Sequence, residues 1–509
     1  MKKIIITVLV ASVALSSCRK YIDVNTNPNT PTVTKSNFVF ANALNSSARV
    51  AAGGMFITGG SWCGYYGHST SFTGGGEEKT YVFTDNSFNY FDGVYDNLND
   101  YQYVINHADA DGYGYLKGPA MIMQVMMWQK LVDLYGNVPF SQALQGTQFI
   151  TPAYDDAAAI YQAITAKLTA AVTLIDATTF PSNEPSDIIF NANKVLWKKF
   201  ANTLKLRLIL RRSNVAGYNA ATDISTISAD GYIDAPVLSN PGYVKSSGKI
   251  NQYYNNYGFN ENDAPTGDFR KMGFAIVEWL KASGDIFRLS RICSAKADPA
   301  NAMFSTLPSD YNGVPLGGAG NPYLSSNVSA MGRMQIKLGD ATRPMILMSD
   351  AESYFLQAEA RQKGWLGGSA QAAYEEGVRR SFRLCANTYA SFSTASQATA
   401  DATANTYLTS GYANADWTAS TDKFKAIWVQ KWVALCNVDA SEEFAEYRRT
   451  TSPTNVNGTL PPGFSAHSVA VTGPEPVRLY YPLREENVNG ANVPQGINIF
   501  TSRIFWDIN

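Results

Sequence analysis

Segments whose large apolar residues recur with the period of an α-helix dominate this chain and constrain its fold more than any other feature. Trp128, Leu131, Val132 and Tyr135, for example, stand at offsets 0, 3, 4 and 7, a spacing that places them on one face of a helix. The segments predicted to be helical are residues 121–135, 157–175, 197–212, 348–363, 370–384 and 424–435. Because 45% of the residues are apolar, they can enclose a large core. The sequence therefore predicts a mainly α protein.

Two of these segments form a unit that resembles a tetratricopeptide hairpin. Tyr354 and Ala358 share one helix, glycines at 364, 367 and 368 interrupt it, and Ala370, Tyr374 and Gly377 follow at offsets 0, 4 and 7. Small residues at these positions let two helices cross closely. Arg361 stands where an aromatic residue is usual, so the match is partial. With degenerate copies around Trp128 and Trp197, the expected scaffold is a superhelix of stacked helical hairpins.

Long stretches between these helices are rich in Gly, Asn, Ser and Tyr. Residues 53–89, 236–268, 298–333 and 386–420 are expected to be irregular, with a few short strands such as residues 80–83. Irregular stretches of this length are uncommon in a compact domain and usually carry function. These loops are therefore predicted to form the ligand-binding side of the molecule.

Aromatic residues interleaved with amides in these loops suit a neutral sugar, because a ring stacks on its C–H face and amides bond its hydroxyls. The richest stretch is residues 251–258, with three Tyr and four amides. The predicted ligand-binding residues are Trp62, Tyr65, Tyr66, Tyr81, Tyr90, Asn251, Tyr253, Tyr254, Tyr257 and Tyr311, with Tyr323 in the same loop region as Tyr311. The alternative is that these rings anchor long loops onto the body.

The N-terminus has the layout of a bacterial export signal. Lys2 and Lys3 precede an apolar run that is too short to span a bilayer. Leu15-Ser16-Ser17-Cys18 then resembles the lipobox of bacterial lipoproteins, in which the cysteine is acylated. The predicted organisation is a signal peptide at 1–17, lipidated Cys18 with a tether at 18–35, and one helical body at 36–509. An ordinary secretory signal with a coincidental Cys18 is the alternative.

Charge and histidine content exclude several functional classes. The net charge of −1 lacks the basic excess that nucleic-acid binding requires. Only three histidines occur, and none pairs at ligand spacing, so neither a histidine metal site nor a Ser-His-Asp triad is expected. No cofactor is predicted. Asp92, Asp96 and Asp100 form an acidic stripe, for which binding of a structural Ca²⁺ is an alternative to a solvated surface. Cys63, Cys293, Cys385 and Cys436 are expected to be free thiols.

Six short motifs, in order across most of the chain, together resemble the SusD/RagB family of nutrient-binding lipoproteins. They are YIDVNTNP (21–28), DLYGNVPF (133–140), WKKFAN (197–202) with LKLR (204–207), AESYFLQAEA (351–360), QKW (430–432) followed by EYRR (446–449), and RLYYP (478–482). The resemblance implies a helical body with a ligand site made by loops. It also implies docking on a SusC-like TonB-dependent outer-membrane transporter.

Family members capture oligosaccharides, and some capture peptides, without cutting them. The function expected from this resemblance is therefore non-catalytic capture of a nutrient oligomer, most simply an oligosaccharide, by a protein anchored to the outer membrane through Cys18. Arg19 at the second mature position is not the Asp of an inner-membrane retention signal, which favours the outer membrane. The resemblance implies that the protein faces the cell surface, although Arg19 and Lys20 are basic where surface-exported members of the family often have acidic residues. Alternatives are an oligopeptide-binding member of the family, or a lipid-anchored helical glycoside hydrolase that uses two carboxylates such as Glu77 or Glu78.

Overall fold

The computed structural model describes residues 34–72, 76–88, 90–267, 269–296, 298, 305–332, 334–386, 394–450 and 459–508. Helices dominate it, which confirms the mainly α prediction. They are α2 (Ser36–Ala51), α3 (Gly54–Trp62), α4 (Glu77–Thr80), α5 (Phe91–Asp111), α6 (Lys117–Tyr135), α7 (Ala157–Ala177), α8 (Lys194–Arg211), α9 (Ala220–Ile224), α10 (Gln252–Tyr257), α11 (Phe274–Ala282), α12 (Ile286–Ile292), α13 (Asp350–Gln362), α14 (Ala370–Ala386), α15 (Thr394–Leu408), α16 (Lys423–Leu435), α17 (Ala440–Thr450) and α18 (Leu483–Asn489).

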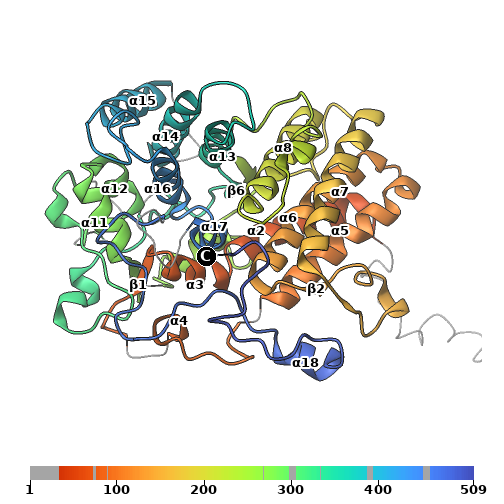
Figure 1. Cartoon of the computed structure of the whole chain (residues 1–509), viewed down its shortest axis with the longest axis horizontal. Helices are drawn as coiled ribbons and strands as arrows, with labels where there is room; N and C mark the ends of the chain where they lie inside the picture. The colour runs from red at the N-terminus through yellow and green to blue at the C-terminus, as the bar shows by residue number, and fades with distance from the viewer. Residues whose placement is uncertain are drawn as a thin grey trace, which may run out of the picture.

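The long helices pack as a continuous array in which each contacts the next. α5 packs on α2 and α6, α6 on α7, α7 on α8, α8 on α13, α13 on α14, and α14 on α15. In Figure 1 this array runs from α5–α8 on one side to α13–α15 at the top, and irregular segments with α4 and α18 lie along the lower edge. α7 is long and apolar enough to cross a membrane by composition, but it is packed between α6 and α8.

Capping side chains explain where several helices begin, and a small residue explains how closely two helices cross. Asp156, Asn193 and Asp422 each accept a hydrogen bond from the first turn of α7, α8 and α16, which satisfies donors that the helix leaves free. Gly377 of α14 lies so close to α13 that an added Cβ would stand 2.9 Å from the Phe355 ring. This is the close crossing that the small residues of the hairpin predicted.

Strands are few and short in the described part of the chain. β1 (Tyr66–His68) pairs antiparallel with β5 (Arg270–Met272), β2 (Val138–Pro139) with β3 (Tyr154–Asp155), and β4 (Val237–Ser239) with β6 (Met345–Met348). In the first pair His68 stands opposite Arg270. This pairing joins segments far apart in sequence and fixes the loops that follow β1 and precede β5.

The structure corrects several sequence-based expectations about irregular segments. Residues 80–83 form no strand, because α4 ends there and Tyr81 takes the left-handed conformation with φ 56°. Helices α3, α10 and α15 occupy stretches predicted to be irregular. The sequence of α15 is dominated by Ala and Thr and has no amphipathic period from which a helix could be predicted, and the helix packs on α14.

The N-terminal signal, Cys18 and the tether up to residue 33 lie outside the described residues, and the described body begins with α2. Within the body, Cys63, Cys293, Cys385 and Cys436 are buried free thiols. Burial raises the pKa of Cys385 to about 12. These thiols are therefore protonated and inert at neutral pH.

Candidate ligand-binding site

The aromatic residues predicted to present a flat surface to a sugar lie in the core instead. Trp62, Tyr65 and Tyr66 are at most 1% exposed. The Tyr66 hydroxyl donates to Asn437 Oδ1 at 3.0 Å, the Tyr65 hydroxyl donates to the Trp432 carbonyl, and the Trp62 indole donates to the Glu78 carbonyl at 3.1 Å. Because buried polar groups are satisfied internally, these side chains act as anchors between α3, β1 and α16.

Residues 251–257 show the same outcome. They form helix α10, in which Asn251 caps the first turn by accepting from the Tyr254 amide at 3.0 Å. Tyr253 and Tyr257 pack on Phe56 at centroid distances of 5.1 and 5.4 Å. Tyr253, Tyr254 and Tyr257 are all buried. The expectation of an exposed loop is therefore wrong for this segment, and contact of these residues with a ligand stays a prediction.

The remaining predicted tyrosines are also enclosed. Tyr81 is 6% exposed, and its hydroxyl accepts from the Ser468 amide at 3.2 Å. The buried hydroxyl of Tyr90 has no hydrogen-bond partner among the described residues, and burial raises its pKa. Tyr311 is fully buried and donates to the Ser305 carbonyl at 2.9 Å. The structure thus brings none of the ten predicted residues together on an open surface.

An exposed aromatic surface does exist, and three loops that are distant in sequence build it. The Ser69 amide donates to the Phe269 carbonyl at 2.8 Å, and the Thr70 amide donates to the Tyr323 carbonyl at 2.8 Å. The Ser325 amide donates to Ser71 Oγ at 2.9 Å. We call this surface the loop shelf and define it by Phe72, Phe269, Arg270 and Tyr323.

Two rings of the loop shelf are stacked, and one of them is exposed to solvent. Phe72 and Phe269 lie 4.3 Å apart between centroids with an interplanar angle of 20°. Phe72 is 40% exposed, whereas Phe269 is half-buried. The Arg270 guanidinium lies 4.6 Å from the Phe269 centroid and 5.6 Å from the Tyr257 centroid. An aromatic face beside a half-buried cation suits a ligand that has both C–H faces and acceptors.

Polar groups surround these rings. Asn321, Ser326 and Asn327 are exposed on the loop that carries Tyr323. Beneath the shelf, His68 Nε2 and Glu78 Oε1 lie 2.7 Å apart. Burial favours the neutral acid, but the hydrogen bond and charge of His68, together with the Arg270 charge and a backbone hydrogen bond, lower the pKa of Glu78. The shelf therefore combines a stacked aromatic pair, a cation and a fringe of amides and hydroxyls.

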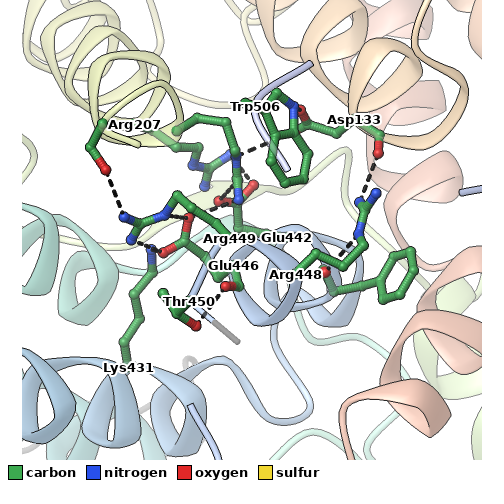
Figure 2. Close-up of polar contacts among 12 residues, drawn as sticks. Asp133, Arg207, Lys431, Glu442, Glu446, Arg448, Arg449, Thr450 and Trp506 are labelled. Atoms are coloured by element: carbon green, nitrogen blue, oxygen red, sulfur yellow. Dashed lines mark hydrogen bonds and ion pairs between the residues drawn. The ribbon is translucent and has the colours of Figure 1, made fainter. Parts of the chain in front are cut away.

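The densest group of titratable side chains lies elsewhere, in the core where α8, α13, α16 and α17 meet. Figure 2 shows Arg449, Glu446 and Lys431 close together. Arg449 and Lys431 lie 2.7 and 2.9 Å from Glu446, and Arg449 also pairs with Glu359 of α13 at 2.8 Å. Arg207 pairs with Glu352 at 2.8 Å. Burial opposes ionisation of Glu446, but Arg449 and the neighbouring cations lower its pKa well below the usual value. Each of these side chains is at most 4% exposed.

This buried ion network has no surface for a substrate. Catalytic carboxylates need access to the bond that they cleave, whereas these are sealed and paired with cations. No group of three or more metal-ligating side chains lies together among the residues that the structure describes. Of the acidic stripe on α5, Asp92 pairs with Arg484 at 2.9 Å and Asp100 accepts from Asn42 at 3.1 Å.

A family model described as "SusD-like_2: Starch-binding associating with outer membrane" matches residues 28–482. The chain belongs to this family. No curated protein shows significant similarity to it.

Solved structures share the fold of this SusD-like chain. A SusD homologue from Bacteroides fragilis is 20% identical with a TM-score of 0.74, covering 93% of this chain and 99% of that one. A SusD/RagB family protein from Bacteroides thetaiotaomicron is 19% identical with a TM-score of 0.74, covering 94% and 100%. A chitin-binding SusD homologue from Flavobacterium johnsoniae is 21% identical with a TM-score of 0.69, covering 93% and 99%. These likenesses confirm the helical SusD-like fold.

Sequence reasoning missed Phe72 and Phe269 because neither lies in a run of aromatic residues. Phe72 follows Ser69-Thr70-Ser71, and Phe269 precedes Arg270. Each is a lone large apolar residue in a polar stretch, and this local pattern does not tell whether the ring is exposed or buried.

Proposed function

We propose that this SusD-like chain is an outer-membrane lipoprotein that captures a nutrient oligosaccharide on the loop shelf and delivers it to a SusC-like TonB-dependent transporter. The observation that carries the proposal is the stacked pair Phe72–Phe269, with Phe72 exposed to solvent, flanked by Arg270 and a fringe of amides. The family description as starch-binding and associated with the outer membrane supports it. The chitin-binding relative supports a glycan over a peptide.

Capture in this proposal needs no bond cleavage. The Phe72–Phe269 pair stacks on the C–H face of a sugar ring, while the exposed Asn321 and Asn327 amides and Arg270 bond its hydroxyls. Contacts on an open shelf keep water on one side, so binding is weak and release to a transporter follows readily.

The direct test removes both rings of the shelf. The double variant Phe72→Ala/Phe269→Ala should lower affinity for the bound oligosaccharide about tenfold or more, since each stacking contact contributes about 0.5–1.5 kcal/mol. The measurement is isothermal titration calorimetry against maltooligosaccharides, chitooligosaccharides and a tripeptide panel. Phe38→Ala is the matched control, because Phe38 is 65% exposed on α2. Unchanged affinity in the double variant would exclude the shelf, and heat from peptides alone would reassign the ligand class.

Two further measurements test the rest of the proposal. Incubation with the same glycans should release no new reducing ends, and their appearance would favour the glycosidase alternative.

Affinity purification from the native membrane should recover a TonB-dependent barrel together with the protein. Recovery of the protein alone, under conditions that keep membrane complexes intact, would contradict the transporter partnership.

A further inference from the structure

A cavity that is remote from the loop shelf opens between α5, the segment around β2 and β3, and α18. Its volume is about 340 Å³, at the lower end of the range of about 300–1,000 Å³ found for small-molecule sites. In Figure 1, α18 and β2 lie at one end of the lower edge and β1, which leads into the shelf, lies at the other. The cavity and the shelf share no residue.

Aromatic residues form the inner wall of this cavity, and they are held in place. Tyr95 packs edge-on against Trp128 at 5.5 Å and donates its hydroxyl to the Pro139 carbonyl at 2.6 Å. Phe91 beside it is buried, while Phe149 from the opposite loop is half-buried. The wall can therefore stack on a ligand without a rearrangement that would cost binding energy.

Carboxylates line the mouth in excess. Asp92, Asp96 and Glu485 face one cation, Arg484, so the formal charge of the mouth is −3 + 1 = −2. Two of the carboxylates are already engaged: Asp92 pairs with Arg484 at 2.9 Å, and Glu485 accepts from the Tyr154 hydroxyl at 2.9 Å.

Asp96 is different, because it is exposed and has no ion-pair partner in the described part of the chain. Asn99, one helical turn further along α5, is exposed beside it. The cavity thus presents a free carboxylate and a free amide next to a fixed aromatic wall.

We propose that this cavity binds a single saccharide ring that carries a protonated amine, as in an amino sugar. The amine pairs with Asp96, the ring hydroxyls bond Asn99, and the C–H face stacks between Tyr95 and Phe149. The net negative mouth disfavours acidic sugars and favours a cation. The site goes beyond the proposed function, because it needs neither the loop shelf nor a transporter.

The test compares two ligands with the same sugar backbone: the trimer of glucosamine, whose amines are protonated, and the trimer of N-acetylglucosamine, whose acetamide groups are neutral and bulkier. The glucosamine trimer should bind more tightly at low salt, and added salt should weaken its binding alone. Asp96→Asn should lower affinity for the glucosamine trimer about threefold to tenfold and leave the acetylated trimer unchanged. Calorimetry, or saturation-transfer NMR where the heat is small, measures both.

Control variants separate this site from the shelf. In the Phe72→Ala/Phe269→Ala background, which removes binding on the shelf, Phe149→Ala should still weaken the salt-sensitive binding of the glucosamine trimer, so loss of the shelf and loss of the cavity give different patterns. Equal binding of the two trimers, or indifference to both Asp96→Asn and Phe149→Ala, would overturn the proposal. Equally tight binding of trilysine would overturn the saccharide assignment.

Discussion

At the scale of single residues, the buried glutamates illustrate how context sets charge. Glu446 is surrounded by Arg449, Lys431 and Arg211, and these cations hold its pKa well below the usual value despite burial. Glu443, three residues earlier and equally buried, has no hydrogen-bond partner for either carboxylate oxygen among the described residues. Burial raises its pKa well above the usual value. Neighbours on one helix therefore favour opposite protonation states.

Glu443→Gln should consequently raise the free energy of unfolding at neutral pH. An acid whose folded pKa is raised binds its proton more tightly in the folded state, so stability is highest at low pH and falls as pH rises above the unfolded value of about 4.3. The uncharged amide does not lose stability in this way. The gain should therefore shrink as pH falls toward about 4, which urea unfolding at several pH values measures.

Glu486→Gln is a control for this experiment, because Glu486 is exposed on α18. Its substitution should change stability little at any pH. A Glu443→Gln variant that is less stable than the parent at pH 7 and equally stable near pH 4 would contradict the argument.

At the scale of elements, the array depends on how closely neighbouring helices approach. The α13–α14 contact has no room at Gly377, where a Cβ would stand 2.9 Å from Phe355. Gly93, in the first turns of α5, has nothing within 4 Å of the same position. The two helical glycines therefore have different effects. Gly377 allows two helices to cross closely, whereas Gly93 lowers the stability of its helix without a packing gain.

Alanine at these two positions should have effects of opposite sign. Gly377→Ala should destabilise the protein by about 1–3 kcal/mol, because overpacking exceeds the helix-propensity gain. Gly93→Ala should stabilise it by up to about 1 kcal/mol. Thermal unfolding of both variants measures the difference, and Phe355→Leu should partly rescue Gly377→Ala. Stabilisation by Gly377→Ala would show that the helices can separate without cost.

At the scale of the whole molecule, the C-terminal segment packs against helices from the first half of the chain and closes the body. The Leu479 amide, from the last irregular segment, donates to the Leu134 carbonyl at 2.9 Å. Near the C-terminus, Trp506 lies under the Arg211 guanidinium at 5.2 Å, and Figure 1 places the chain end beside α17. The binding side is therefore built on a frame that the last residues complete.

In the proposed lipoprotein, Cys18 alone attaches this body to the membrane. Cys18→Ser should move the protein from the membrane fraction to the soluble fraction, since two or three acyl chains are needed for stable anchoring. Fractionation followed by mass spectrometry of the N-terminal peptide measures this. The purified variant should keep its affinity for the oligosaccharide, and a variant that remains membrane-bound would contradict anchoring through Cys18.

Much of the helical frame could be predicted because its determinants are local. The predicted helix at residues 157–175 matches α7 within two residues, and the acidic residues before it include the observed cap Asp156. The prediction failed where a helix lacks an amphipathic period, as in α15, or where tyrosines and amides predict a loop, as in α10. In both cases packing against the rest of the chain decided the structure.

The sequence by itself determined most of the long helices and membership of a family, because period, caps and motifs are properties of neighbouring residues. Only the tertiary structure decided which aromatic rings face water. Tyr253 and Phe72 both stand in polar surroundings in the sequence, yet α10 turns Tyr253 onto Phe56, whereas β1–β5 pairing leaves Phe72 beside Phe269 at the surface. Exposure is set by contacts between segments far apart in the chain, and no local pattern records them.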